Sequence, residues 1–278
     1  MNHIKQPKLY IIFKYAIYFG LIIFVVFPLY WIVTTSIRTT PEIMNTNLSL
    51  IPQTFTLEHY KEAFLQVNLL QCLKNSLIIT AITVVISIVA GIFMAYAFAR
   101  RRFRGKSFLL FTVLSTQFIP VIAYIIPLFL IMSSLRVLNT YPALWITYLG
   151  IAFPVAVMLL INYIKDVPVD LEEAAWIDGC SPIGTLLHVV FPLAAPGIVS
   201  TAVYVFITIW QEYLIAVSFI TKEGSYTASM ALTKFQGAYG TDWGGLMAGA
   251  VSISIPVVIL FLCSRKLFAD TLTGGIKG

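Results

Sequence analysis

Residues Asn75–Ala99 read NSLIITAITVVISIVAGIFMAYAFA and contain no charged side chain. A helix needs about 20 mostly apolar residues to cross a bilayer, so this stretch predicts a transmembrane helix. The rest of the chain has the same character, because 59% of its 278 residues are hydrophobic and only 11% are charged. Soluble domains carry about 25% charged residues. The composition therefore excludes a soluble, a nucleic-acid-binding and a disordered protein.

Five further stretches are long and apolar enough to span a membrane. The six predicted spans are residues 15–33, 75–99, 108–133, 140–164, 196–220 and 243–264. These runs are too long and continuous for the strands of a β-barrel, and helices satisfy their own backbone hydrogen bonds in lipid. We therefore expect an all-α integral membrane protein in which residues 1–278 form a single transmembrane domain. The first span has no small-x-small cleavage site, so we expect it to be retained.

The distribution of Lys and Arg predicts the orientation. If the N-terminus is cytoplasmic, the inner segments hold twelve of these residues, namely Lys5, Lys8, Lys14, Arg100, Arg101, Arg102, Arg104, Lys106, Lys165, Arg265, Lys266 and Lys277. The outer segments hold six, namely Arg38, Lys61, Lys74, Arg136, Lys222 and Lys234. Cytoplasmic loops carry the excess of positive charge. Both termini are therefore expected on the cytoplasmic side.

The residues that often build metal or catalytic sites are scattered. The cysteines are Cys72, Cys180 and Cys263, and the histidines are His3, His59 and His188. The odd cysteine count and the spacings give no disulfide framework and no zinc motif. The histidines are isolated in the chain, so the sequence predicts no metal site and no catalytic residue.

The triplet Gly105-Lys106-Ser107 resembles the end of a phosphate-binding loop. Arg100 stands where that motif requires its first glycine, and the triplet lies between two spans. The motif also needs a preceding strand and a following soluble helix. We therefore do not expect this chain to bind or hydrolyse ATP.

The first outer segment, residues 34–74, contains a predicted short helix. Thr56 is a candidate N-cap, because its hydroxyl can accept a hydrogen bond from the first turn. Leu57, Tyr60, Phe64 and Val67 follow at helical spacing and are expected to form its apolar face.

The second inner loop, residues 165–192, reads KDVPVDLEEAAWIDGCSPIGTLLHVVFP. Asp170 is a candidate N-cap of a helix over 171–178, with Glu173 three residues later as in a capping box. Gly179 supplies the left-handed residue that ends such a helix. Ser181 and Pro182 then suit the N-cap and first position of a second helix. Pro192 either ends that helix or leads into the fifth span.

The first of these helices is expected to dock on another protein. Leu171, Ala174, Ala175 and Asp178 share one face, and small residues allow close approach to a partner groove. The alternative is a helix that floats on the membrane surface, but such helices face the headgroups with Lys and Arg. This helix carries Glu172, Glu173 and Asp178 instead.

The loop resembles the Glu-Ala-Ala motif of bacterial ABC importer permeases. Glu173-Ala174-Ala175 precedes Gly179 by three residues, and Val189-Val190-Phe191-Pro192 stands where the family has Ile-x-Leu-Pro. Further similarities lie in the first two spans and at the C-terminus, namely Phe27-Pro28-Leu29-Tyr30-Trp31, Asn75-Ser76-Leu77-Ile78, Ala95-Tyr96-Ala97-Phe98-Ala99-Arg100 and Thr271-Leu272-Thr273-Gly274-Gly275-Ile276-Lys277-Gly278. These segments are most similar to the six-span partner of the maltose-type carbohydrate permeases.

The resemblance implies partners that supply the energy and the substrate. It implies a second permease subunit, two ATPase subunits that hold ATP and Mg²⁺, and an extracytoplasmic solute-binding protein that meets the outer loops. The substrate would be a small carbohydrate, and the location a bacterial cytoplasmic membrane. The implied ATPase-coupling residues are Glu172, Glu173, Ala174, Ala175, Asp178, Gly179 and Pro192. Their role would be mechanical, and this chain would hold no cofactor.

The fifth predicted span contains one acid, Glu212, beside Trp210, Gln211 and Tyr213. A charge near the centre of a membrane helix costs roughly 2.5–3.5 kcal/mol on insertion scales, so Glu212 is expected to face a cavity or a partner. One hypothesis is that these four residues line a translocation path for a polar solute. The alternative is a structural hydrogen bond to another span or to the partner permease.

Two other function classes stay open at this point. An ion-coupled secondary transporter could use Glu212 as its proton site, although the sequence shows no internal repeat of the kind common in that class. A membrane enzyme would need clustered His, Asp or Glu residues, and the acids at 166–178 have no such partners. The leading prediction is the permease subunit of an ABC importer.

Overall fold

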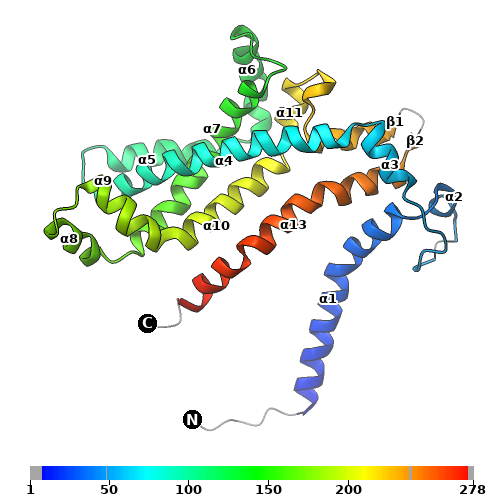
Figure 1. Ribbon diagram of the computed structural model, residues 1–278, viewed down its shortest axis with the longest axis horizontal. Coiled ribbons are helices and arrows are strands. Elements are labelled where there is room, and N and C mark those ends of the chain that lie inside the picture. Colours follow the sequence, from blue (N-terminus) through cyan, green and yellow to red (C-terminus); the bar gives the residue numbers. More distant parts are fainter. Residues whose placement is uncertain (1–7, 48, 238–239, 275–278) are drawn as a thin grey trace. The chain divides into compact units, whose positions relative to one another are not determined.

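The computed structural model describes residues 8–47, 49–237 and 240–274 (Figure 1). The first seven residues and the final four lie outside this range, so the structure does not test the predicted location of either end, nor the motif residues Gly275–Gly278. Contacts divide the chain into two compact units. The first unit contains the chain up to Leu69 together with Leu232–Ser254, and the second contains Leu70–Ala231 and the chain from Ile255 onward.

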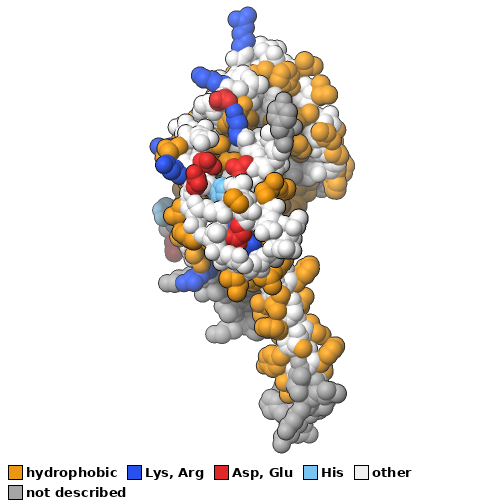
Figure 2. Space-filling model, turned by 90° about the vertical axis from the view of Figure 1, so that its right-hand side faces the viewer, with side chains coloured by type: hydrophobic (Ala, Val, Ile, Leu, Met, Phe, Trp, Pro, Cys, Tyr) orange, Lys and Arg blue, Asp and Glu red, His pale blue; other side chains and the backbone are white. Residues whose placement is uncertain are grey.

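Within the described residues, five continuous helical stretches are long and apolar enough to cross a membrane. They contain the helices α1 (Lys8–Ser36), α4 (Leu69–Arg100), α7 (Tyr141–Lys165), α10 (Phe191–Trp210) and α13 (Trp243–Gly274). Figure 2 shows hydrophobic side chains over the length of α1. Exposed apolar side chains on these helices, such as Phe24 on α1, suit a surface solvated by lipid rather than by water.

The predicted third span, residues 108–133, is not a continuous helix. It consists of α5 (Lys106–Ser115), the 3-10 turn η1 (Thr116–Phe118) and α6 (Val121–Ser134), and the pair is bent by 100°. Pro120 causes the break, because proline has no N–H for the helix ladder and forces the preceding residue out of the helical region. Ile119 accordingly has φ −87° and ψ 118°. The part of the chain that the structure describes therefore has six candidate spans if this bent pair counts as one.

The predicted fifth span, residues 196–220, has the wrong boundaries. Its helix α10 ends at Trp210, and the short helix α11 (Leu214–Phe219) follows after a three-residue break. At its other end α10 continues directly from a π-helical turn, Leu186–Val190. Gln211 and Glu212 stand at this break, but apolar residues resume at Leu214, so the mean hydropathy of the stretch does not reveal it.

The core of the second unit lies where α4, α7 and α10 meet. Ser87 and Ala95 on α4 are fully buried. A Cβ on Gly91, between them, would stand 3.1 Å from Leu160 Cδ1 and 3.6 Å from Ala156 Cβ on α7. The small residues at four-residue spacing on α4 thus form a helix-packing seam.

Two polar residues at the start of α4 attach a distant loop to this core. The amide of Asn75 donates to the carbonyls of Gly224 and Tyr226 at 3.0 and 2.9 Å, and Ser76 Oγ accepts from Ala228 N at 2.7 Å. This loop contains the 3-10 turn η3 (Glu223–Ser225) and α12 (Ala228–Ala231). Asn75 and Ser76 therefore have a structural reason to stand in the second span.

The first unit contains short elements beside α1 and the start of α13. They are α2 (Thr40–Ile43), α3 (Glu58–Leu65), the 3-10 turn η4 (Leu232–Phe235), and the antiparallel pair β1 (Gln236–Gly237) and β2 (Gly240–Thr241). Thr54 anchors the chain between α2 and α3, because its hydroxyl donates a hydrogen bond to the carboxylate of Glu42. The backbone N–H of Gln53 donates to the same carboxylate. The pKa of Glu42 is lowered by these contacts, first by the hydroxyl of Thr54 and next by the N–H of Gln53.

The predicted outer helix exists, but its predicted buried face is wrong. Thr56 Oγ1 accepts from Glu58 N at 3.1 Å at the start of α3, consistent with a capping role. The buried residues of α3 are His59 and Ala63, while Leu57 and Phe64 are 57% and 37% exposed. Apolar spacing misleads here because the packing partner of α3 presents polar groups to it.

Candidate functional site

The inner loop folds as a helical elbow, with one predicted cap misplaced. Helix α8 (Val169–Ile177) starts directly after Pro168, so Asp170 lies in the first turn and is not the N-cap. Proline fixes the backbone angle for a helix start and needs no hydrogen bond there, which explains the earlier start. Asp170 and Glu172 still suit the positive end of the helix dipole.

The turn after α8 forms as the sequence predicts. Gly179 has φ +86°, and Cys180 N donates to Ala175 O at 2.9 Å across it. This is the left-handed stop that favours glycine. Ser181 then caps α9 (Pro182–Thr185) by accepting from Gly184 N at 3.1 Å. The helix continues through the π-helical turn, so Pro192 does not end it but lies in the first turn of α10.

A buried ion pair attaches α8 to the end of α4. Glu172 is 0% exposed and accepts from Arg100 Nε at 2.5 Å and from Tyr96 Oη at 2.8 Å. Arg100 Nη2 also donates to the carbonyls of Ile164 and Val167 at 2.7 and 2.6 Å. One guanidinium therefore joins the ends of α4 and α7 to α8. Glu172 is an internal anchor and is not a surface contact.

Sequence reasoning identified Glu172 but missed its partners. In the sequence, Arg100 belongs to the basic run that indicates orientation, and Tyr96 belongs to a family motif. Tyr96 and Arg100 are four residues apart at the end of a span, so they share a helix face. This spacing is the sequence feature that could have indicated a shared acidic partner.

The opposite side of α8 is exposed and mixed in character. We define the coupling surface as Leu171, Glu173, Ala174, Ile177 and Asp178, all of which are exposed. Ile177 is 87% exposed, whereas Ala175, which was predicted to share the docking face, is buried. Exposed apolar side chains rimmed by charge are typical of protein interaction sites. Gly179 and Pro192 are also exposed.

Glu212 lies at the break after α10, not at the centre of a helix. Its carboxylate accepts from the backbone N–H groups of Ile215 and Ala216 at 2.8 and 3.2 Å, which caps the first turn of α11. Tyr148 Oη on α7 donates to the same carboxylate at 2.7 Å. The structure thus provides the structural hydrogen bond to another span that the sequence left as an alternative.

The other predicted path residues differ in their surroundings. Trp210 is 4% exposed and stacks on Phe206 with ring centroids 5.3 Å apart. Gln211 is exposed, and Tyr213 is half-buried beyond the end of α10. The break therefore separates Tyr213 from the stacked pair of Trp210 and Phe206 on α10.

A cavity of about 370 Å³ lies in the second unit at the break of the third span. Its lining includes the polar side chains of Thr116, Gln117, Tyr124 and Thr147 beside apolar ones. Thr147 adjoins Tyr148, the hydrogen-bond partner of Glu212. Sequence reasoning missed this cavity because hydropathy marks a span without showing how its two halves lie relative to each other.

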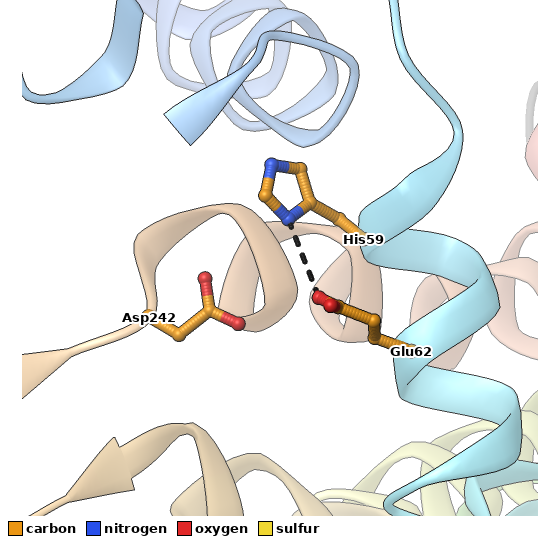
Figure 3. Close-up of side chains that lie close together, drawn as sticks. All are labelled: His59, Glu62 and Asp242. Atoms are coloured by element: carbon orange, nitrogen blue, oxygen red, sulfur yellow. Dashed lines mark ion pairs between the residues drawn. The ribbon is translucent and has the colours of Figure 1, made fainter. Parts of the chain in front are cut away.

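The first unit brings together residues that could hold a metal ion. His59 and Glu62 on α3 lie near Asp242, with one ligand atom from each within 4.8 Å of the others (Figure 3). The histidines are isolated in sequence, which led to the prediction of no metal site. Packing of α3 against the start of α13 makes that reasoning inadequate, because it places His59 beside a distant acid.

The sequence matches the family described as the inner membrane component of binding-protein-dependent transport systems, over residues 87–273. A curated relative, the sulfoquinovosyl glycerol transport system permease protein SmoH of Agrobacterium fabrum, is 33% identical over 91% of this chain and 89% of its own. The trehalose transport system permease protein SugB of Mycobacterium tuberculosis is 35% identical over 90% and 92%. The trehalose/maltose transport system permease protein MalG of Thermococcus litoralis is 34% identical over 91% of both chains.

A solved structure has the same fold. It is a chain of a bacterial ABC transporter involved in the import of the acidic polysaccharide alginate, with a TM-score of 0.81 and 20% identity. The match covers 96% of this chain and 99% of that chain. At this identity the likeness concerns the fold alone.

The buried ion pair predicts unequal effects of two neighbouring substitutions. We expect Glu172→Leu to lower the free energy of unfolding by about 3–5 kcal/mol, because it leaves Arg100, whose side chain is only 10% exposed, without its counter-charge. Glu173→Leu is the matched control on an exposed position of the same helix and should change it by less than about 0.5 kcal/mol. Denaturant unfolding of the purified chain in detergent measures both, and equal values would contradict the anchoring role.

Proposed function

The chain belongs to the family of binding-protein-dependent transport system inner membrane components, and on this premise we propose that it is the sugar-translocating subunit of an ABC importer. It would pair with a second permease subunit, two ATPase subunits and an extracytoplasmic solute-binding protein. Hydrolysis of ATP with Mg²⁺ would take place in the ATPase subunits, and this chain would contribute no catalytic group.

The observation that carries this proposal is the anchored elbow of α8 and α9. Its exposed coupling surface offers Leu171, Ala174 and Ile177 to an apolar groove, while Glu173 and Asp178 supply acceptors at the rim. Its buried side is joined to α4 and α7 through Arg100. An ATPase that moves α8 would therefore act directly on two membrane helices.

This arrangement can use ATP only if the ATPase discriminates between conformations. A ligand shifts a conformational equilibrium only by its difference in affinity for the two states. The ATP-bound and ATP-free motor must therefore hold α8 in different positions, and Glu172 must stay attached to α4 in both. A rigid attachment serves this purpose better than a flexible loop.

Carbohydrate is the substrate class that the relatives support. Those named above transport sulfoquinovosyl glycerol, trehalose, or trehalose and maltose, according to their names, and a further relative from Streptomyces coelicolor is named for diacetylchitobiose uptake. Because all of these are glycosides, we infer a small oligosaccharide or glycoside as the substrate of this chain.

The charge distribution supports the placement in the membrane. The twofold excess of Lys and Arg in the inner segments favours cytoplasmic termini and a cytoplasmic elbow, where an ATPase can reach it. The loop Thr221–Asp242 would then face outward and meet the solute-binding protein. A bacterial cytoplasmic membrane fits this topology.

Trp210, Gln211, Glu212 and Tyr213 remain our candidates for the translocation path, with unequal roles. Glu212 is held by Tyr148 and two backbone N–H groups, so its role would be to stabilise the helix break between α10 and α11. Gln211 is exposed there and can hydrogen-bond a sugar hydroxyl directly. Trp210 and Tyr213 would shape the walls beside it.

An ion-coupled secondary transporter is not favoured. A proton site requires a carboxylate that is free to gain and lose a proton during transport. The carboxylate of Glu212 already accepts hydrogen bonds from Tyr148 and from two backbone N–H groups, which gives it a structural role at the break after α10.

Docking of the ATPase is tested by adding bulk to the coupling surface. We expect Glu173→Trp to reduce the amount of ATPase subunit that co-purifies with the permease at least tenfold, because the indole would hold the two surfaces apart. Lys222→Trp introduces the same indole on an exposed outer loop and should leave co-purification unchanged. Full retention of the ATPase by the Glu173→Trp protein would contradict the proposal.

The path assignment is tested at the span break. We expect Gln211→Ala to reduce sugar uptake into proteoliposomes at least fivefold while the ATPase stays bound, because a hydrogen bond to the substrate is lost. Ser218→Ala, a change at a half-buried hydroxyl on the following helix, should transport normally. Normal uptake by both Gln211→Ala and Glu212→Gln would remove this region from the path.

A further inference from the structure

Helix α3 and the start of α13 pack closely in the first unit because two glycines make room. A Cβ on Gly244 would lie 2.2 Å from His59 Nε2, and a Cβ on Gly245 would lie 2.3 Å from Asp242 Oδ2. Both distances are impossible for real atoms, so any side chain at either position would displace the imidazole or the carboxylate. The two glycines therefore fix where His59 and Asp242 lie.

The hydrogen bond of His59 determines which ring nitrogen carries its proton. Nε2 lies 3.0 Å from the backbone carbonyl oxygen of Arg38. A carbonyl oxygen can only accept, so Nε2 must be the N–H donor. In a neutral imidazole, Nδ1 then has an unprotonated lone pair. His59 is 4% exposed, so water has little access to that lone pair.

The free nitrogen of His59 points toward two carboxylates (Figure 3). Nδ1 forms no hydrogen bond with any residue that the structure describes, and the nearest oxygen of Glu62 is 4.0 Å away. One oxygen of Asp242 accepts from Gly245 N at 3.0 Å, which orients that carboxylate. Figure 2 shows acidic side chains beside a histidine on one face of the protein. Three acceptors thus face one another without a donor among them.

We propose that this cluster binds a divalent transition-metal ion of the zinc type, through His59 Nδ1 and the carboxylates of Glu62 and Asp242. A nitrogen with two carboxylate oxygens suits Zn²⁺, whereas Ca²⁺ and Mg²⁺ prefer oxygen ligands alone. The hydrogen bond from Nε2 to a carbonyl is the outer-shell contact that typically orients a metal-binding histidine.

The distances allow the ion to enter with small side-chain movements. Ligand atoms around a tetrahedral Zn²⁺ are about 3.3 Å apart when each metal–ligand bond is about 2.0 Å. The three candidate atoms lie within 4.8 Å of one another. Glu62 is half-buried and Asp242 is exposed, so both carboxylates can rotate inward while the buried His59 stays in place. A solvent water would complete the coordination.

The bound ion would act as a cross-link within the first unit. His59 and Glu62 belong to α3, and Asp242 directly precedes the last span helix, α13. A metal at this point would hold these two parts of the chain together. This role is independent of substrate translocation, so it concerns a site that the proposed function does not need.

Metal titration of the full-length chain in detergent tests the proposal. The protein carries Cys180→Ser and Cys263→Ser, because exposed thiols also bind zinc, and its affinity tag is removed. We expect one Zn²⁺ per chain by calorimetry, a rise in Tm on binding, and visible absorption bands on binding Co²⁺. Ca²⁺ at the same concentration should give no signal.

Two conservative variants and one control localise the ion. Glu62→Gln and Asp242→Asn should each weaken zinc binding at least tenfold and abolish the rise in Tm, while leaving Tm in a chelator unchanged. His188→Gln, at an exposed histidine elsewhere, should bind zinc as the parent does. The proposal would be overturned if the parent protein bound no stoichiometric zinc, if either variant bound zinc as tightly as the parent, or if the parent bound Ca²⁺ as tightly as Zn²⁺.

Discussion

A buried carboxylate needs a counter-charge, and the position of α8 follows from this requirement. Glu172 is fully buried and meets Arg100 and Tyr96 from α4. Removing one member of a buried pair costs about 3–5 kcal/mol, so α8 cannot leave α4 without a large loss of stability. Because Arg100 also binds two carbonyls near the end of α7, a force on the elbow reaches both membrane helices. The exposed side of α8 remains available for a partner.

Features with a local cause could be predicted from the sequence. The left-handed turn at Gly179, the cap at Ser181 and the seam of small residues on α4 each depend on a few neighbouring residues, and the structure contains all three. The helical, membrane-spanning fold was also predictable, since it follows from the length of the apolar stretches. Family membership was predictable from the spacing of Glu173, Ala174, Ala175 and Gly179.

Features with a distant cause could not be predicted. Pro120 breaks the third span, but five other prolines remain inside described helices, at positions 28, 127, 154, 196 and 256, so proline alone does not indicate a break. The role of Glu212 depends on Tyr148, and the burial of His59 depends on glycines at the start of α13. Apolar periodicity did not identify the buried side of α3, because that side faces polar groups. Many apolar side chains of this protein are exposed instead.

The central claim is that the pair Glu172–Arg100 transmits the movement of the ATPase to the membrane helices. The most direct measurement is the number of sugar molecules imported per ATP hydrolysed by reconstituted importer in which Glu172→Leu and Arg100→Met are combined. Replacing both charges avoids an unpaired buried charge and is often neutral for stability. Our account predicts that hydrolysis continues while import per ATP falls at least tenfold. An unchanged ratio in a folded, ATPase-bound complex would contradict it.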